Sequence, residues 1–299
     1  MAVTQPSRNT ITCENLDEAI DHYTTKLGYR LDMIVPADAP REALVSKGGE
    51  RIRLVLENHP VGETPPPLLC KEGSWITGRA GMEYRDLIPG RLGGKVIASH
   101  IRLNTGGEVP DYVHYHKVDF QMIYCKRGRI RVVYEDQGEP FWLETGDCVL
   151  QPPEIRHRVL ECTAGAEVIE VSMPAEHETW VEHKIDLPTA DVKPDRDFSG
   201  QRFVRHIAAD AEWKRSEFDG HEERNTGIAR ATDGLADVRV FRSVRNDATL
   251  TAEQFLKFPL DRGEILAIRL RAAAQPMSFN TRLTEKCSFS ANRRVQPDK

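Results

Sequence analysis

The sequence has no long hydrophobic run, and no block of basic residues. No stretch approaches 18 apolar residues, so a membrane span is not expected. Lysine and arginine number 41 against 46 acidic residues, a net charge of -5, which gives nucleic-acid binding no electrostatic support. The first 20 residues lack a basic segment followed by an apolar one, so no secretory signal is expected. We therefore expect a cytoplasmic protein with neither a membrane nor a nucleic-acid partner.

Cysteine is scarce as well, and its spacing gives no sign of a CxxC metal or redox site. The six cysteines form no CxxC pair, and in a chain without a signal segment they are typical of reduced thiols. Cys125 and Cys148 lie inside apolar runs, which predicts small core residues. A length of 299 residues corresponds to about two domains, enough to bury a core without disulfides or a structural metal.

Residues 9–57 show the pattern of a strand, a helix and three further strands. Asn15 can cap the helix, and Glu18 three residues later completes a capping box. Gly28 ends the helical spacing of apolar residues, and strict alternation marks the last strand, RIRLVLE. The segment is therefore predicted to be a small α+β unit of the order βαβββ.

Two stretches of this unit, NLDEAIDHYTTKLGYRLDMI and RIRLVLE, resemble a half-module of the glyoxalase/bleomycin-resistance family, the vicinal oxygen chelate fold. In that family two such units form a metal cup, and only one is visible here. Glu57 matches a family ligand, but Thr10 and Thr12 stand on the first strand where another ligand is expected. One carboxylate cannot hold a metal, so we interpret the unit as structural or as a dimer element. The face that a partner half-module usually covers would be a large apolar patch, so we expect the unit to pair with its copy in a homodimer or to dock on the chain's own barrel.

The remaining chain divides at two boundaries. Residues 58–72, NHPVGETPPPLLCKE, hold four of the 18 prolines and indicate a linker. From about Val96 short strands follow one another at a spacing of about ten residues, which is typical of an all-β barrel or sandwich. The predicted domains are a half-module at 1–57, a linker at 58–85, a barrel at 86–190 and a C-terminal β region at 191–299.

The residues that indicate chemistry lie between 107 and 157. His114 and His116 form an HxH pair, whose imidazoles face the same way on a strand. Gln121 follows after a bend, and barrel closure can bring His157 beside the pair. Three neutral imidazoles with open coordination positions are typical of a catalytic metal site rather than a closed structural one.

This stretch resembles both sequence motifs of the cupin family, over about residues 90–180. The resemblance implies a mainly β fold, a cupin β-barrel or jelly roll, that binds one metal ion. The second motif departs from the family twice, since Glu154 replaces a glycine and Glu161 an asparagine. The matching residues are Gly107, His114, His116, Gln121 and Gly128 in the first motif and Gly146, Pro152 and His157 in the second.

Gln121 stands where the family has glutamate. An amide is neutral and a weaker ligand, so a divalent ion would keep about one more unit of positive charge. Gln121 either ligates the ion through its oxygen or hydrogen-bonds a metal-bound water. The expected cofactor is one divalent transition metal ion, with Fe(II) first and Mn, Ni, Cu, Co or Zn as alternatives.

Other side chains are candidates for the surroundings of this metal. Alternation along the strand after His157 places Glu161 on the same inward face, where it could act as a general base or contact a metal ligand. It could instead be a salt-bridged residue at the rim. A set of large side chains could line a substrate pocket or belong to the core: Tyr112, Tyr115, Phe120, Met122, Tyr124 and Trp142.

The C-terminal region is predicted to be a degenerate second cupin. FLKFPLDRGEILAIRL resembles the hairpin of the first motif with Gly263 at its turn, but no HxH precedes it. Residues 278–299 lack periodicity and are expected to fray.

The preferred function is a metal-dependent oxygenase, of the dioxygenase type, acting on a small organic substrate. The three-histidine cupin oxygenases of the family suggest this reaction. A metal-dependent isomerase or lyase of a sugar or keto acid is the first alternative. A non-enzymatic cupin that binds or senses a small molecule is the second.

Overall fold

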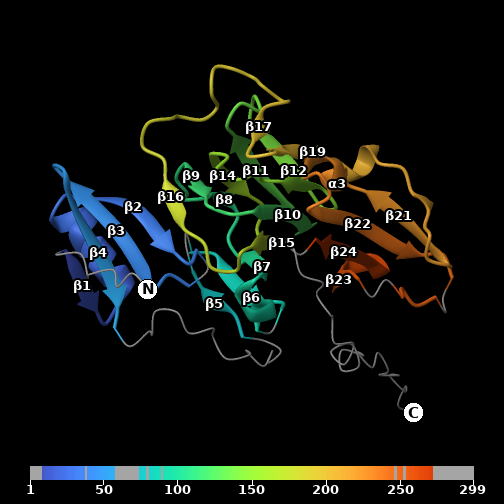
Figure 1. The fold of residues 1–299 in the computed structure, drawn as a ribbon, viewed down its shortest axis with the longest axis horizontal. Helices are drawn as coiled ribbons and strands as arrows, with labels where there is room; N and C mark the ends of the chain where they lie inside the picture. The colour runs from blue at the N-terminus through green and yellow to red at the C-terminus, as the bar shows by residue number, and fades with distance from the viewer. Residues whose placement is uncertain are drawn as a thin grey trace, which may run out of the picture.

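The computed structural model describes residues 9–37, 39–57, 74–78, 81–88, 90–245, 248–251 and 254–271 (Figure 1). Of the predicted linker at 58–85, residues 58–73, 79 and 80 lie outside these residues, as does the predicted frayed tail at 278–299. Residues 76–77 and 83–85 of that linker belong to strands. Strands dominate, and they form two large sheets, one five-stranded sheet and a two-stranded one. Within the described part of the chain, none of the helices is long and apolar enough to cross a membrane.

The N-terminal unit has the predicted order of elements. Its helix begins where expected, because the Asn15 side chain accepts hydrogen bonds from the backbone N–H groups of Asp17 and Glu18 and donates to the Glu18 carboxylate. The helix packs on one face of the sheet through Leu16 and a small apolar cluster. The elements are β1 (Thr10–Cys13), α1 (Leu16–Asp21), η1 (His22–Lys26), β2 (Arg30–Val35), β3 (Glu42–Lys47) and β4 (Glu50–Leu56).

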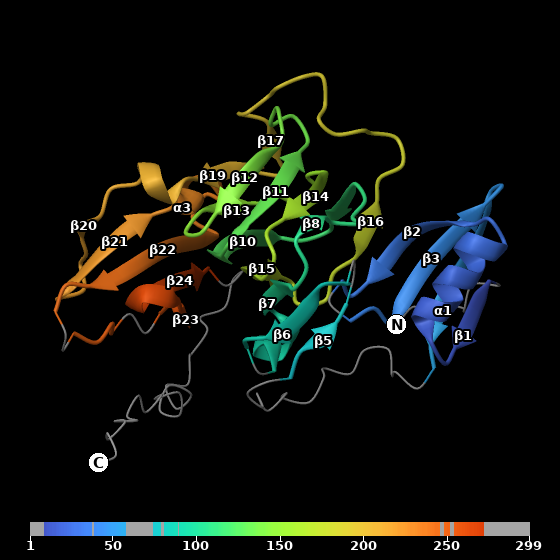
Figure 2. The ribbon, with the colours of Figure 1, turned by 180° about the vertical axis from the view of Figure 1, so that it is seen from behind.

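This unit docks on the chain's own barrel by adding its sheet to a barrel sheet. Strand β2 pairs antiparallel with β16 (Thr179–Val181), so the order β1-β4-β3-β2 continues directly into the barrel. Arg41 forms an ion pair with Glu176, and His183 Nε2 lies 3.0 Å from the carbonyl oxygen of Leu31. Of the two arrangements predicted, the structure shows this one, and Figures 1 and 2 place the unit at one end of the molecule.

The barrel consists of two sheets that face each other, which confirms the mainly β jelly-roll prediction. One sheet, the histidine sheet, contains β16, β9 (His114–His116), β14 (His157–Cys162), β11 (Arg129–Tyr134) and β12 (Phe141–Glu144), with β8 (Gly107–Glu108) beside β14. The other, the facing sheet, contains β19 (Val204–His206), β13 (Cys148–Leu150), β10 (Phe120–Arg127), β15 (Ala166–Met173), β7 (Ile97–Leu103), β6 (Glu83–Asp86) and β5 (Ile76–Thr77). Smaller elements are α2 (Arg91–Gly94), β17 (Asp197–Phe198) and β18 (Gln201–Arg202).

The turn between β10 and β11 requires the glycine of the first motif. Gly128 has a φ of +70°, which side chains other than glycine rarely adopt. A Cβ atom there would lie 2.5 Å from Thr163 Oγ1 and 3.2 Å from Ala166 Cα. Gly128 therefore permits both the turn and the close approach of the neighbouring segment.

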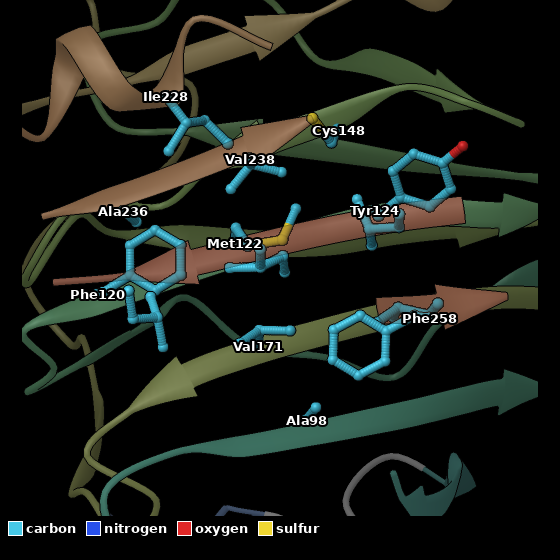
Figure 3. Packing of buried hydrophobic residues seen from close by; sticks show 14 of the residues in the cluster. Ala98, Phe120, Met122, Tyr124, Cys148, Val171, Ile228, Ala236, Val238 and Phe258 are labelled. Atoms are coloured by element: carbon cyan, nitrogen blue, oxygen red, sulfur yellow. The ribbon is translucent and has the colours of Figure 1, made fainter. Parts of the chain in front are cut away.

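The described residues of the C-terminal region form a third layer of the molecule. Its five-stranded sheet packs on the outer face of the facing sheet, and α3 (Ile228–Ala231) lies at one edge of the contact (Figure 3). Strand β19 at 204–206 pairs with β13, so the predicted boundary at 190 falls before the last strand of the barrel. The strands are β20 (Lys214–Arg215), β21 (His221–Asn225), β22 (Ala236–Ser243), β23 (Leu256–Pro259) and β24 (Glu264–Leu270), with the short turns η3 (Ala208–Asp210) and η4 (Asp261–Gly263).

This layer accounts for half of the side chains that were candidates for a pocket. Phe120, Met122 and Tyr124 point out of the barrel into the contact with Val238 and Phe258 (Figure 3). None of the six candidates lines the cavity beside the histidines. The predicted core role of the two cysteines is confirmed, since Cys125 and Cys148 are fully buried and burial raises the pKa of the Cys125 thiol to about 12.

Candidate metal centre

Three histidines of the histidine sheet converge inside the barrel. His114 and His116 project from β9 on the same side, and His157 begins β14 directly opposite His114. One nitrogen of each imidazole lies within 4.8 Å of the corresponding nitrogens of the other two. All three side chains are buried, and no other such cluster of potential ligands occurs in the described residues.

Backbone carbonyl groups orient two of the rings. His114 Nδ1 lies 2.8 Å from the carbonyl oxygen of Tyr112, and His157 Nδ1 lies 2.9 Å from that of Ile155. A carbonyl oxygen can only accept a hydrogen bond, so each Nδ1 carries the proton. The lone pair of each neutral ring is therefore on Nε2, the tautomer that a metal ligand requires.

The third ring is held by a residue from a distant part of the sequence. Thr179 Oγ1 lies 2.8 Å from His116 Nδ1, and Thr179 is fully buried. Thr179 belongs to β16, the strand that joins the barrel to the N-terminal unit. The carboxylate of Asp111, also buried, lies 3.7 Å from His114 Nδ1. Such outer contacts fix ring orientation and raise the basicity of the ligand.

The donor set fits a divalent transition metal. Imidazole nitrogens bound to one ion at about 2.0–2.1 Å lie about 3–3.4 Å from one another when adjacent. The separations of up to 4.8 Å therefore require only small inward side-chain movements. The sequence had singled out the three histidines, and the structure brings them together at one point.

Gln121 projects into the barrel from the opposite sheet. It is 1% exposed, and its Nε2 has no hydrogen-bond partner in the protein. An orphaned buried amide is costly unless a bound group pairs with it. Its position on the inward face of β10 and its unpaired Nε2 fit a residue that contacts a bound group. Gln121 is not among the residues that line the cavity described below.

Glu161 does not face the histidines, contrary to the expectation from alternation. The pairing of β11 with β14 shifts register between Arg131 and Val132, so Val159 pairs with Val132 but Glu161 pairs with Arg131. This bulge turns Glu161 outward, where its side chain is 43% exposed and lies 3.9 Å from Arg131. The structure gives it the alternative role, a salt-bridged residue outside the cavity.

A cavity of about 50 Å³ lies beside the three histidines. Its polar lining, apart from the histidines, includes Gln151, Glu170 and Tyr134. A second cavity of about 20 Å³ shares Tyr84, His116 and Glu170 with the first. It adds His177, whose ring centroid lies 5.3 Å from that of His116. Most of the remaining wall of the first cavity is apolar: Met82, Ile101, Leu103, Ile123, Ile130, Val132, Val159 and Val168.

Glu170 is the one carboxylate among the residues that line the first cavity. It stands on β15, across from Ile123 of β10 and Ser99 of β7. Burial raises the pKa of the Tyr134 hydroxyl, and the charge of Glu170 raises it further, so this phenol remains neutral and able to donate a hydrogen bond. Tyr134 itself lies beside His157 in the histidine sheet. The cavity lining therefore includes one carboxylate, the phenols of Tyr84 and Tyr134, and the guanidinium of Arg158.

Sequence reasoning missed Thr179, Gln151 and Glu170. A polar residue in a buried strand is the signal that could have found two of them: Gln151 alternates with Val149, and Glu170 with Val168. Thr179 has no such signal, because its importance comes from a contact with His116 across 63 positions of the sequence.

Residues 99–172 match the family model of the cupin domain. No curated protein matches the chain. Similar solved structures include an RmlC-like cupin from Shewanella frigidimarina NCIMB 400, 25% identical over 34% of this chain and 84% of that one, with a TM-score of 0.29. KdgF from Halomonas sp. is 20% identical over 34% and 87%, with a TM-score of 0.29. Oxalate decarboxylase from Bacillus subtilis is 14% identical over 54% and 52%, with a TM-score of 0.37, so the chain spans about half of that protein.

Proposed function

We propose that this protein, whose residues 99–172 form a cupin domain around a three-histidine centre, is a metal-dependent enzyme that acts on a small organic substrate. The observation that supports the proposal most is the buried trio of His114, His116 and His157, which lines a cavity with room for a ligand. Structural metal sites are filled by four protein ligands, whereas catalytic sites keep a position open. Function on this fold has to be argued from the site.

Oxygenase activity is the finer proposal. The bound ion, with Fe(II) first and Mn, Ni, Cu, Co or Zn as alternatives, would supply Lewis acidity and, where it is redox-active, electron transfer to dioxygen. The protein's part is to hold the ion with neutral ligands, so that its positive charge attracts an anionic substrate. The carbonyl groups of Tyr112 and Ile155 and the hydroxyl of Thr179 keep the three rings in place for this task.

A metal-dependent isomerase or lyase is a second candidate, and Glu170 favours it. Such reactions need a proton acceptor beside the substrate and no oxygen. Glu170 lines the same cavity as the three histidines, and a carboxylate there can take a proton from a substrate carbon or hydroxyl. It replaces Glu161 as the candidate base.

Metal analysis with substrate turnover tests the proposal. The full-length chain, loaded with Fe(II) under argon, is expected to hold about one ion per chain. The triple variant His114→Ala/His116→Ala/His157→Ala is expected to hold none and to remain folded by circular dichroism. Oxygen uptake with a panel of small carboxylates and phenols would support the oxygenase. Formation of product isomers without oxygen uptake would support the isomerase or lyase. Equal metal content in both proteins would refute the metal centre, and ligand binding without turnover would indicate a binding protein.

The homodimer inferred from the sequence stays a prediction, and so does a cytoplasmic location. The N-terminal unit was expected to need a partner for its apolar face, and β16 of the same chain provides a strand for its sheet. Light scattering of the full-length protein would show whether two copies also associate.

A further inference from the structure

Gln151 is buried at the wall of the metal cavity with its side chain unpaired. The residue follows β13, is 1% exposed, and lines the cavity together with the three histidines. Neither Nε2 nor Oε1 of its amide has a hydrogen-bond partner in the protein. A buried amide that makes none of its hydrogen bonds destabilises the fold, so its retention in a cavity wall indicates a partner from outside the chain.

Two further unpaired groups lie next to Gln151. Its backbone N–H donates to the carbonyl oxygen of Gln121 at 2.9 Å, and Gln121 lies opposite Ser172 in the pairing of β10 with β15. Gln121 Nε2 and Ser172 Oγ are also buried without a partner in the protein. We call Gln121, Gln151 and Ser172 the orphan polar cluster. Of the three, Gln151 is the one whose side chain lines the cavity.

A buried glutamine elsewhere in the chain differs in part. Gln201 is 6% exposed, and its Nε2 donates to the carbonyl oxygen of Asp119, while its Oε1 is unpaired in the protein. The fold therefore pairs one atom of this amide with its own backbone, whereas it pairs neither atom of the Gln151 amide. Gln151 differs because its amide faces a cavity.

The chemistry of the amide selects its partner. Nε2 donates hydrogen bonds and Oε1 accepts them. A hydroxyl group both accepts and donates, so one hydroxyl can pair with both atoms. A carboxylate only accepts and would leave Oε1 unpaired, and an aromatic ring or methyl group would leave both atoms unpaired.

The charge of the site selects the rest of the ligand. This step rests on the proposed function, in which three neutral imidazoles hold a dication. Glu170 is the one carboxylate in the cavity lining and Arg158 the one guanidinium, so with a bound dication the site keeps net positive charge and attracts an anion. We propose that the substrate is a small hydroxycarboxylate and that Gln151 is the residue that recognises its hydroxyl group.

Calorimetric titration of two matched probes tests this inference. Glycolate and acetate differ by one hydroxyl group, and both are small enough for the cavity. The protein is the full-length chain, first shown by elemental analysis to be loaded with Co(II), which absorbs visible light and does not react with oxygen under these conditions. The variants are Gln151→Met, which keeps the length of the side chain without its amide, and Gln151→Leu in case the first variant folds poorly. Gln137→Met is the matched control, because the Gln137 amide donates a hydrogen bond to the backbone carbonyl oxygen of Lys193 at the surface.

The wild type is expected to bind glycolate more tightly than acetate. In Gln151→Met this preference for glycolate should fall about tenfold, which is the loss expected for the hydrogen bonds of one hydroxyl group. Chelation of the hydroxyl group by the ion should account for the preference that remains. The Co(II) spectrum without probe should not change. The unfolding midpoint of the metal-free variant should rise, because an unpaired buried amide has been removed.

An unchanged preference in both Gln151 variants would overturn the inference, and so would a wild type that does not distinguish glycolate from acetate. Loss of the preference in Gln137→Met would overturn it as well. A wild type that takes up no Co(II) would instead refute the proposed function, and the elemental analysis shows this before any titration.

Discussion

The two faces of strand β10 contact different parts of the molecule. Phe120, Met122 and Tyr124 point outward and pack against the C-terminal sheet (Figure 3). Gln121 and Ile123 point inward, toward the barrel interior and its cavity. The outer face is apolar and closely packed, whereas the inner face carries a buried amide without a partner.

The comparison shows how one strand can separate stability from function. Burying the outer side chains stabilises the fold, since each removes a large apolar surface from water. The inner face keeps polar groups that would be better paired or replaced if stability alone mattered. The inner face also holds Ile123 and Cys125, which belong to a second apolar cluster. The proposed function involves the inner face alone, so polar substitutions there and truncations on the outer face should have separable effects.

The largest effect is expected from truncation on the outer face. Phe120→Ala removes a fully buried ring and should lower the free energy of unfolding by about 3–5 kcal/mol. The folded fraction should still bind one metal ion. Urea denaturation and metal analysis measure the two quantities. Val192→Ala, at a side chain that is largely exposed, is the control and should change stability by less than about 0.5 kcal/mol. Loss of metal from folded Phe120→Ala would show that the two faces are not separable.

The next effect concerns the contact between β16 and the histidine sheet. Thr179→Val removes the hydroxyl that holds His116 Nδ1 and should weaken metal binding about 10–100-fold, because outer contacts orient the ligand ring. Chelator competition measures the affinity. Thr77→Val, at an exposed position on β5, should leave it unchanged. Equal affinity in both variants would show that His116 is oriented without Thr179.

Substitution of Gln121 tests whether the inner face of β10 contacts the ion. If the amide oxygen is a ligand, Gln121→Glu should bind the ion about tenfold more tightly, since a carboxylate adds a negative charge beside a dication. Gln121→Ala should weaken binding modestly and leave the three imidazoles. Chelator titration of the three proteins separates these outcomes. Three coincident curves would remove Gln121 from the metal site.

The smallest effect is a pH dependence of stability outside the site. The pKa of His206 is lowered, first by burial and second by the positive charge of Arg224. The negative charge of Asp147 offsets part of this by raising the pKa. The unfolded chain then takes up a proton more readily, so stability is lost as the pH falls through the ordinary value of 6.5. His206→Gln should flatten urea-unfolding stability between about pH 7.5 and 5.5. Part of the slope should remain, because burial also lowers the pKa of His100. His22→Gln, at an exposed position, should keep the wild-type slope.

Local patterns in the sequence were sufficient for several features. The helix cap at Asn15 and the core role of Cys125 follow from residue type and near neighbours, and the structure shows both. The HxH spacing places two imidazoles on one side of a strand wherever that strand lies. The glyoxalase-like resemblance, the degenerate second cupin and the oxygenase reaction stay predictions.

The tertiary structure decided what depends on pairing between distant strands. Alternation alone placed Glu161 inward, and one bulge between β11 and β14 turned it outward. Alternation also cannot tell which face of β10 meets the cavity, because that depends on where the C-terminal sheet packs. Thr179 reached His116 only because β16 lies beside β9. The sequence by itself determined which residues could bind a metal, while strand register, a non-local property, decided which side chains surround it.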